Sequence, residues 1–291
     1  NSATQVITVS VTDVDDVAPT FTSLGSFSAA ENQTAIGTVT ATDTDSAGVT
    51  FSVSSSEVAI SVGGVLSFIS PPDYEFKSAY SVVVTATDGT NSASQTVDID
   101  IQDANDNAPV ISSPAAYDAN ENQTAIGTVV ATDADSESII FSVSGDDLAI
   151  TAEGVLSFKA APDYETNASY SATITATDGV NQSSQAITVT VIDVNDVAPV
   201  FTSGAEFSGL ENQTAIGTVT ATDVDSDNGT ITFSVSGDAL AVSDTGVLSF
   251  VAAPDYELQT SYTATVTATD GANSATKVIT VSVTDVDDEA P

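Results

Sequence analysis

Apolar and polar residues alternate along much of the chain, in short runs separated by Gly, Pro and Asp. In residues 170–176, Tyr, Ala and Ile alternate with Ser and Thr, and in residues 187–191 Ile and Val alternate with Thr. A period of two is typical of strands with one buried face. Between residues 110 and 199 the pattern predicts one strand near the start and further strands at Ala125–Thr132, Ile139–Ser144, Leu148–Thr151, Val155–Phe158, Tyr170–Thr177 and Ala186–Ile192. About seven short strands in such a stretch predict an all-β fold, a Greek-key β-sandwich.

The alternating pattern belongs to a repeat. The sequence ENQTAIGTV begins at Glu31, Glu121 and Glu211, an interval of 90 residues. PDYE, ATDG and a closing D-x-(N/D)-D-x-A-P segment recur in the same order, and the third copy is two residues longer. The repeats predict a tandem array, a rod of three units at 20–109, 110–199 and 200–291, preceded at 1–19 by the last strand and linker of another unit. We therefore expect the chain to be a piece of a longer polypeptide.

The aromatic residues keep the period of the repeat. They occupy two recurring positions, Phe51, Phe141 and Phe233 at one and Phe68, Phe158 and Phe250 at the other. This spacing favours a role in the core over an exposed platform for stacking ligands.

The amino-acid composition excludes several classes of binding partner and of catalytic chemistry. The chain has 41 Asp and Glu residues against 3 Lys and Arg, for a formal net charge of −38. Nucleic acid and anionic membrane surfaces are excluded as partners because their recognition needs basic residues. With no His and no Cys, the usual zinc ligands, disulfides and thiol or imidazole catalysis are excluded as well. No apolar stretch is long enough to insert into a bilayer.

Most of the acids sit at fixed places in the repeat, in turns beside strand ends, where loops commonly carry function. These recurring acids are Asp13, Asp15, Asp16, Asp103, Asp106, Asp193, Asp196, Asp285, Asp287 and Asp288 in the closing segments, Glu31, Glu121 and Glu211 in ENQT, Asp43, Asp45, Asp133, Asp135, Asp223 and Asp225 in ATDxD, Asp73, Glu75, Asp163, Glu165, Asp255 and Glu257 in PDYE, and Asp88, Asp178 and Asp270 in ATDG. A solvated acidic surface would instead scatter its carboxylates along the strands. The pattern predicts sites for a hard divalent cation.

Five motifs in this order resemble the cadherin repeat. That family has a Glu near the first strand, then D-x-D, D-x-E and a D-G loop, and a linker of the form D-x-N-D-N-x-P. The linker is matched in full by Asp103–Pro109, and the resemblance covers all three repeats and the leading segment.

The resemblance implies Ca²⁺ held between successive repeats by oxygen ligands. The ligands at the junction of repeats 1 and 2 would be Glu31, Asp73, Glu75, Asp103, Ala104, Asn105, Asp106, Asn107, Asp133, Asp135 and Asp178. Those at the junction of repeats 2 and 3 would be Glu121, Asp163, Glu165, Asp193, Val194, Asn195, Asp196, Asp223, Asp225, Asn228 and Asp270. The remaining recurring acids would form incomplete sites at the two ends of the chain.

The two complete junctions differ at the last linker residue, which is Asn107 in one and Val197 in the other. By the family match this side chain gives an oxygen to the ion nearest the following repeat. We therefore expect weaker calcium binding beside Asp223 and Asp270, and a modest tightening from Val197→Asn. A carbonyl at Asn228 would offset part of the difference.

The predicted function is a calcium-rigidified extracellular array, for adhesion, including homophilic adhesion, or as a stiff spacer in a large surface or secreted protein. The composition looks more like bacterial cadherin-like proteins than animal cadherins. Cell-surface proteins or polysaccharides are the expected partners besides calcium. The alternatives are a carbohydrate-binding module of a secreted polysaccharide-degrading enzyme and, with least support, an enzyme. Triplets of the form N-x-S/T also occur, but they arise by chance in a Ser/Thr-rich chain.

Overall fold

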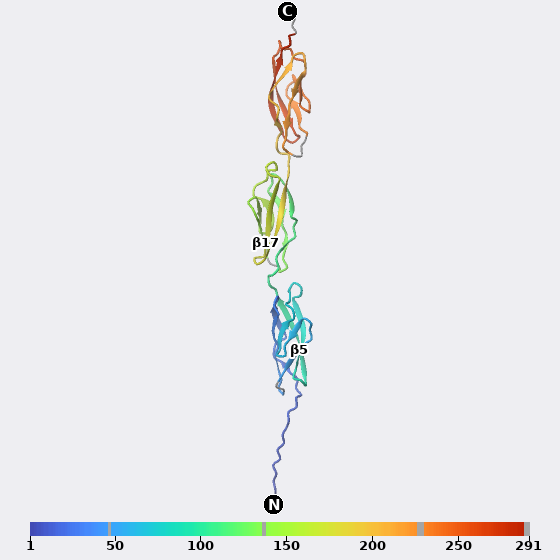
Figure 1. Cartoon of the computed structure of the whole chain (residues 1–291), viewed down its shortest axis with the longest axis vertical. Coiled ribbons are helices and arrows are strands. Elements are labelled where there is room, and N and C mark those ends of the chain that lie inside the picture. The colour runs from blue at the N-terminus through green and yellow to red at the C-terminus, as the bar shows by residue number, and fades with distance from the viewer. Residues whose placement is uncertain (46–47, 136–137, 226–229, 288–291) are drawn as a thin grey trace. The chain divides into compact units, whose positions relative to one another are not determined.

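All regular structure in the described residues is β-strand (Figure 1). The computed structural model describes residues 1–45, 48–135, 138–225 and 230–287. These residues include no helix of the length and hydrophobicity needed to cross a membrane. The chain divides into two units, one made of 1–110, 131–140 and 176–183, and the other of 111–130, 141–175 and 184–291. Two loops of the second repeat therefore belong with the first repeat and the linker that follows it.

The first repeat consists of two short sheets and one two-stranded ribbon, ordered β2-β9-β8-β5, β3-β7-β6 and β1-β4. Its strands are β1 Thr20–Phe21, β2 Ser26–Ala30, β3 Ala35–Thr38, β4 Ala41–Thr42, β5 Thr50–Val53, β6 Val58–Ile60, β7 Val65–Phe68, β8 Ala79–Thr87 and β9 Ser92–Gln102. Its paired strands are antiparallel except for β2 and β9, which run parallel.

The second repeat has the same elements, with sheets ordered β11-β18-β17-β14 and β12-β16-β15. Its strands are β10 Val110–Ile111, β11 Ala116–Asn120, β12 Ala125–Thr128, β13 Ala131–Thr132, β14 Ile140–Val143, β15 Leu148–Ile150, β16 Val155–Phe158, β17 Ser169–Thr177 and β18 Gln182–Ile192. The all-β prediction is confirmed, and each predicted strand has a counterpart.

Two predicted boundaries were wrong. The single strand expected over Ala125–Thr132 is two strands, because the register shifts between Ala125 and Gly127 and the Val129 amide bonds the Gly154 carbonyl instead of continuing that ladder. Gly154 has φ 87°, and a Cβ there would lie 2.3 Å from the Val129 carbonyl oxygen, so the contact requires glycine. Strand β18 also begins at Gln182, before the expected Ala186. Residues 182–185 are all polar, so the alternation with Val and Ile that marked the rest of the strand is missing there.

The third repeat repeats the arrangement, with sheets ordered β20-β27-β26-β23 and β21-β25-β24 and the ribbon β19-β22. Its strands are β19 Val200–Phe201, β20 Glu206–Leu210, β21 Ala215–Thr218, β22 Ala221–Thr222, β23 Thr232–Val235, β24 Leu240–Val242, β25 Val247–Phe250, β26 Ser261–Thr269 and β27 Ser274–Thr284.

A separate apolar core lies in each repeat. In the second repeat Leu156 and Val189 are fully buried, and Phe158 is 3% exposed. Phe141 is half-buried against this core, so both recurring Phe positions are core positions as predicted. Burial of one such side chain contributes roughly 1.5–3 kcal/mol, which makes the core the main source of stability.

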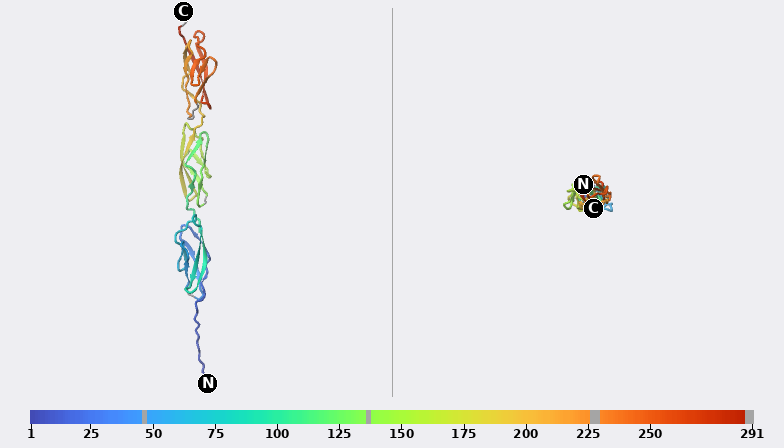
Figure 2. Two further views of the ribbon diagram at one scale, coloured as in Figure 1. Left: turned by 90° about the vertical axis from the view of Figure 1, so that its right-hand side faces the viewer. Right: turned by 90° about the horizontal axis from the view of Figure 1, so that it is seen from above.

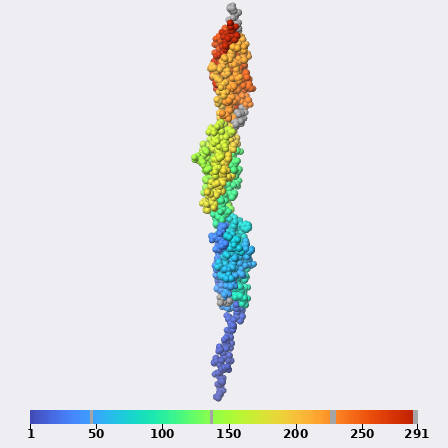
Figure 3. Space-filling model, viewed as in Figure 1, coloured from blue at the N-terminus to red at the C-terminus, as the bar shows by residue number. Residues whose placement is uncertain are grey.

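Residues 1–19 contain no strand. Figures 1, 2 and 3 show the start of this segment as a single extended chain that the rest of its unit does not cover, and Val9 and Val11 are 81% and 93% exposed. Its Val and Ile residues keep the alternation of a strand, but no strand among the described residues pairs with them.

Candidate metal centre at the repeat junctions

Parallel pairing of β2 with β9 brings the first group of acids together. Two parallel strands end at the same edge of a sheet, and here Ala30 lies opposite Gln102. Glu31 directly follows β2 and Asp103 directly follows β9, so the two carboxylates emerge at one edge although 72 positions separate them in the sequence. β11 with β18 and β20 with β27 repeat the arrangement.

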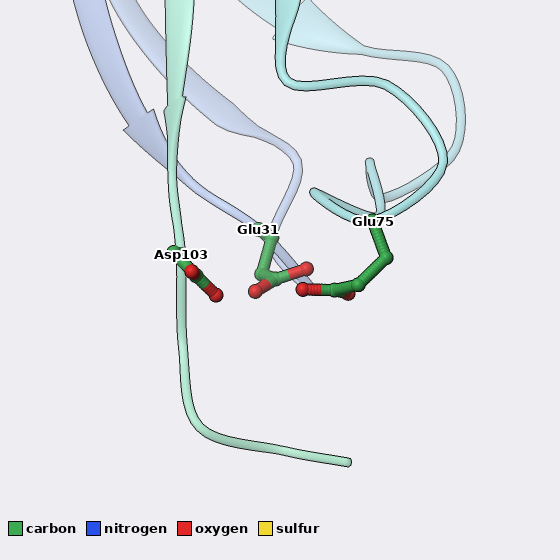
Figure 4. A group of neighbouring side chains, drawn as sticks. All are labelled: Glu31, Glu75 and Asp103. Carbon is green, nitrogen blue, oxygen red and sulfur yellow. The ribbon is translucent and has the colours of Figure 1, made fainter. Parts of the chain in front are cut away.

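Glu31 ties three segments together. It is 3% exposed, and its Oε1 accepts the Ala104 amide at 2.7 Å while its Oε2 accepts the Tyr74 amide at 2.8 Å. The first bond holds the linker and the second holds the PDYE loop. Figure 4 shows Glu31, Glu75 and Asp103 pointing toward one another from the three segments. One carboxylate oxygen of each lies within 4.8 Å of the others.

The linker is also bonded to the D-x-D loop of the next repeat. Asp135 is 6% exposed, and its Oδ2 accepts the amides of Asp106 at 2.9 Å and Asn107 at 2.8 Å. Its own amide bonds Oδ1 of Asp133 at 3.0 Å, which fixes the turn between the two acids. Carboxylate oxygens of Glu75, Asp106 and Asp135 form a second cluster within 4.8 Å of one another.

The second junction has the same construction. Glu121 is 1% exposed and accepts the amides of Val194 at 2.7 Å and Tyr164 at 2.8 Å. It clusters with Asp163 and Glu165, and Glu165 clusters again with Asp196 and Asp225. Both junctions therefore bring together carboxylates of the ENQT and PDYE motifs, the linker and the following D-x-D loop.

Partial versions occur at the two ends of the chain. Near the start, Asp45 accepts the amides of Asp16 at 2.9 Å and Val17 at 3.0 Å. Near the end, Glu211 accepts the amides of Val286 at 2.7 Å and Tyr256 at 2.9 Å. Glu211 also forms an acidic cluster with Glu257 and Asp285.

Several of these acids have one oxygen that is buried and receives no hydrogen bond from any described residue. At the complete junctions they are Asp133 Oδ2, Asp178 Oδ2, Asp223 Oδ2, Asp225 Oδ1 and Asp270 Oδ2, and at the N-terminal end they are Asp45 Oδ1 and Asp88 Oδ2. A buried carboxylate oxygen without a partner is costly and rare in folded proteins. Its recurrence at the same repeat positions indicates a common ligand.

The pKa shifts show how crowded the clusters are. Burial raises the pKa of Glu75, and the neighbouring Glu31 and Asp135 carboxylates raise it further. Burial likewise raises the pKa of Asp103 and of Glu165. The pKa of Asp270 is lowered instead, chiefly by the Asn273 amide that bonds it. The junctions thus hold charged groups at an energetic cost that a cation would offset.

A hard divalent cation fits this set of donors. Every side chain in the clusters offers oxygen, and the sequence contains no His or Cys. Ca²⁺ takes 6–8 oxygen ligands in a flexible shell, whereas Mg²⁺ requires a small octahedral one and usually keeps several waters. The described residues fit Ca²⁺ better.

Some predicted residues lie apart from the clusters described above. Asp73 and Asp255 accept the amides of Phe76 at 3.0 Å and Leu258 at 3.1 Å in their own turns, and Asp13 is exposed. Asn228 and Asp288 lie outside the described residues. The predicted residues not named individually above, Asp15, Asn105, Asp193, Asn195, Asp43 and Asp287, lie in the linkers and in the first D-x-D loop.

The sequence analysis missed two asparagine positions. Asn32 and Asn122 have φ 58° and 59°, and their Nδ2 atoms bond Asp106 and Asp196 of the following linkers, each at 2.5 Å. Asn181 bonds Asn105 in the linker. Their recurrence in ENQT and D-G-x-N was the available signal, but three of these residues start N-x-S/T triplets, which drew attention to chance glycosylation motifs. Their side-chain nitrogens are in fact hydrogen-bond donors at the junctions.

Comparisons with known proteins agree with the motifs. The family model described as Cadherin domain matches residues 205–287. Human protocadherin Fat 1 is 31% identical over an alignment that covers all of this chain and 7% of that protein. Mouse cadherin EGF LAG seven-pass G-type receptor 2 is 30% identical over 78% of this chain and 9% of that protein. The chain thus spans less than a tenth of the length of these relatives.

A solved structure has the same fold over almost the whole chain. The crystal structure of mouse cadherin-23 EC22-24 matches with a TM-score of 0.73 and 26% identity, covering 93% of this chain and 100% of that one.

Proposed function

Because the chain belongs to the cadherin repeat family, we propose that it is a calcium-binding segment of an extracellular adhesion protein. We assign the repeats to 20–109, 110–199 and 200–291, after the last strand and linker of another repeat at 1–19. Calcium at the two complete junctions stiffens the array, and the segment serves in adhesion or as a spacer. The observation that supports this most directly is the set of buried carboxylate oxygens without a hydrogen bond at both junctions.

The acids act through charge and ligation. In the calcium-free chain the clustered carboxylates repel one another, and this repulsion acts against the hydrogen bonds that hold the linkers. Glu31, Glu75 and Asp103 on one side and Asp133, Asp135 and Asp178 on the other would hold the ion, whose positive charge would offset their mutual repulsion. The second junction uses the corresponding residues of the next repeats. Binding to the folded state alone stabilises it by about 2.7 kcal/mol per site when calcium is a hundredfold above Kd.

The proposed localisation is extracellular or at the cell surface, and the proposed partners are cell-surface proteins. Clusters that recur unchanged in successive repeats favour a structural role over catalysis. A carbohydrate-binding module is disfavoured because the relatives and the solved structure reported above are cadherins. Bacterial origin remains a prediction, since the relatives reported are from mouse and human.

The test is a calcium titration of the whole chain by calorimetry, with thermal unfolding in EDTA, in millimolar Ca²⁺ and in millimolar Mg²⁺. We expect Ca²⁺ to raise the melting temperature by roughly 10 °C or more, and Mg²⁺ to raise it far less. Small-angle scattering should show a longer and less variable particle with calcium.

Asp133→Asn and Asp223→Asn should each remove binding at one junction. The matched control is Asp146→Asn, which changes an exposed acid in the β14–β15 turn, outside the clusters described above. Coincident melting curves in EDTA and calcium would refute the proposal.

A further inference from the structure

The loop after each ATDG motif ends in an asparagine that is held rigidly. These residues are Asn91, Asn181 and Asn273. The Asn181 amide bonds Asp178 Oδ1 at 2.7 Å, and its carbonyl accepts the Thr177 hydroxyl at 2.7 Å. Asn273 makes the same two bonds, each at 2.7 Å. The main chain on both sides of the asparagine is thereby fixed by its own loop.

The side chain of this asparagine reaches the linker that precedes its repeat. Asn181 Nδ2 lies 2.8 Å from Oδ1 and 3.3 Å from the carbonyl oxygen of Asn105. Asn273 Nδ2 lies 2.8 Å from Oδ1 and 3.1 Å from the carbonyl oxygen of Asn195. A single amide group thus contacts both oxygens of one linker residue, and this occurs at both complete junctions.

The contact also occurs where the linker residue is Asp. Asn91 Nδ2 lies 3.2 Å from Oδ1 and 3.4 Å from the carbonyl oxygen of Asp15. Asp and Asn share the accepting Oδ1 atom, which explains why either residue serves at this linker position. The contact between Asn91 and Asp15 therefore shows the effect of replacing the linker Asn by Asp within the same chain.

The asparagine joins two groups that the proposed site needs. Asp178 accepts the Asn181 amide through Oδ1, while its Oδ2 is buried and without a hydrogen-bond donor. The Asn105 carbonyl is held by the same asparagine through Nδ2. The spacing of these oxygens is therefore set by hydrogen bonds from the main-chain and side-chain amides of one residue.

We propose that Asn181 and Asn273 are positioning residues that hold the linker against the following repeat before calcium arrives. This inference rests on the proposed calcium function, because its effect on affinity requires the junctions to bind calcium. Holding the linker lowers the entropy lost when the ligands gather around the ion, so binding is tighter than it would be at a loose linker.

The test compares Asn181→Ala with Asn273→Ala in the whole chain, with Asn91→Ala as the matched control, since Asn91 makes the same contact at the other end of β9, away from both complete junctions. Each of the first two variants should weaken calcium binding at its own junction by about fivefold to tenfold, the value of one hydrogen bond. Asn91→Ala should leave both complete junctions unchanged.

Amide hydrogen exchange measured without calcium tests whether Asn181 holds the linker independently of calcium binding. In EDTA, Asn181→Ala should speed amide hydrogen exchange in residues 104–107 about fivefold or more and leave residues 194–197 unchanged. Asn105→Asp should preserve slow exchange, as Asp15 retains the contact, whereas Asn105→Ala should speed it. If Asn181→Ala fails to fold, the variants Asn105→Asp and Asn105→Ala still test the hydrogen bond between Asn181 and Asn105.

The outcomes are distinct. Unchanged exchange and unchanged affinity in Asn181→Ala, in a chain that binds calcium, would overturn the positioning role alone. Absence of calcium binding by the unmodified chain would overturn the proposed function, while exchange in EDTA would still decide whether the asparagine holds the linker.

Discussion

The linkers Asp103–Asn107 and Asp193–Val197 have the same task and differ most at their last residue. Asn107 donates through Nδ2 to Asp135 Oδ1 at 2.9 Å and to Asp106 Oδ1 at 3.0 Å. Val197 has only its main-chain amide to offer, which bonds Asp225 Oδ2 at 3.0 Å. One side chain therefore decides whether the D-x-D carboxylate is fully paired before calcium binds.

The two carboxylates differ accordingly. Asp225 Oδ1 is buried, and no described residue donates to it. Burial raises the pKa of Asp225, although the Val197 amide acts against this. The pKa of Asp135 is lowered, first of all by the Asn107 side-chain amide. In the calcium-free chain both oxygens of Asp135 thus accept hydrogen bonds, whereas Asp225 keeps one buried oxygen to which no described residue donates.

This difference has two opposite effects on affinity. An Asn oxygen adds a ligand at the first junction, as the family resemblance implies. The same amide also stabilises the calcium-free state, and those hydrogen bonds must be given up before the carboxylates can turn to an ion. We therefore expect the junctions to differ more in calcium-free stability than in affinity.

The strongest test of the comparison removes each carboxylate. Asp135→Asn and Asp225→Asn should both weaken calcium binding at their own junction by about a hundredfold, since affinity depends on the ligand charge. In EDTA the two should change the melting temperature in opposite directions. Asp225→Asn removes an unpaired buried charge and should raise it, while Asp135→Asn places an NH₂ group against N–H donors and should lower it. If calorimetry shows melting-temperature changes of the same sign for both variants, the proposed difference between the junctions is wrong.

The carboxyl groups of Asp135 and Asp225 should also titrate at different pH values. Because the pKa of Asp225 is raised, its protonation stabilises the folded chain. This contribution is fully present below the ordinary pKa of 3.8 and is lost as the pH rises through the raised pKa. Because the pKa of Asp135 is lowered, its ionised carboxylate stabilises the folded chain. This contribution is present above pH 3.8 and is lost as the pH falls through the lowered pKa. Carboxyl carbon shifts measured by NMR in EDTA should therefore give an Asp225 midpoint above 3.8 and an Asp135 midpoint below it.

Val197→Asn provides the internal control for that titration. It should lower the Asp225 midpoint towards that of Asp135, because the new amide can donate to the unpaired oxygen. An unchanged Asp225 midpoint would mean that burial and the neighbouring carboxylates set its pKa whether or not an amide donates to the unpaired oxygen.

The sequence predicted much of this arrangement because the repeat displays it three times. A carboxylate that recurs at one position, such as Asp135 and Asp225, can be recognised without knowing its contacts. The β-sandwich followed from the alternation of residues such as Ile174 and Ala176, which are indeed buried.

Contacts between distant residues were not predictable. Nothing in the spacing of Glu31 and Asp103 reveals that β2 pairs parallel to β9. Asn181 carries no charge and lies in a Ser-rich stretch, so its reach to Asn105 is visible only when the linker is seen against the loop. A pattern of residue types records composition and period, whereas hydrogen bonds depend on which loops the fold brings together.

Exchanging the distinguishing residue should have a modest effect on affinity. Val197→Asn should tighten calcium binding at the second junction by about threefold, and Asn107→Val should weaken the first by a similar factor, because the added ligand is partly offset by the stabilised calcium-free state. Calorimetric titration of each variant can resolve the change if the other junction is disabled by Asp133→Asn or Asp223→Asn. A loosening by Val197→Asn would mean that the calcium-free hydrogen bonds outweigh the added ligand.

The smallest difference between the two junctions is expected at the positions where they are alike. Asn32 and Asn122 both adopt positive φ and both donate to the linker aspartate at 2.5 Å. Glycine tolerates this backbone conformation but has no side-chain amide, so Asn32→Gly and Asn122→Gly remove the donor without adding strain. Each should weaken its own junction by about twofold to fivefold, and by the same factor. Because Asn32 and Asn122 make the same bond, unequal losses in matched titrations would show that the inequality of the junctions extends beyond Asn107 and Val197.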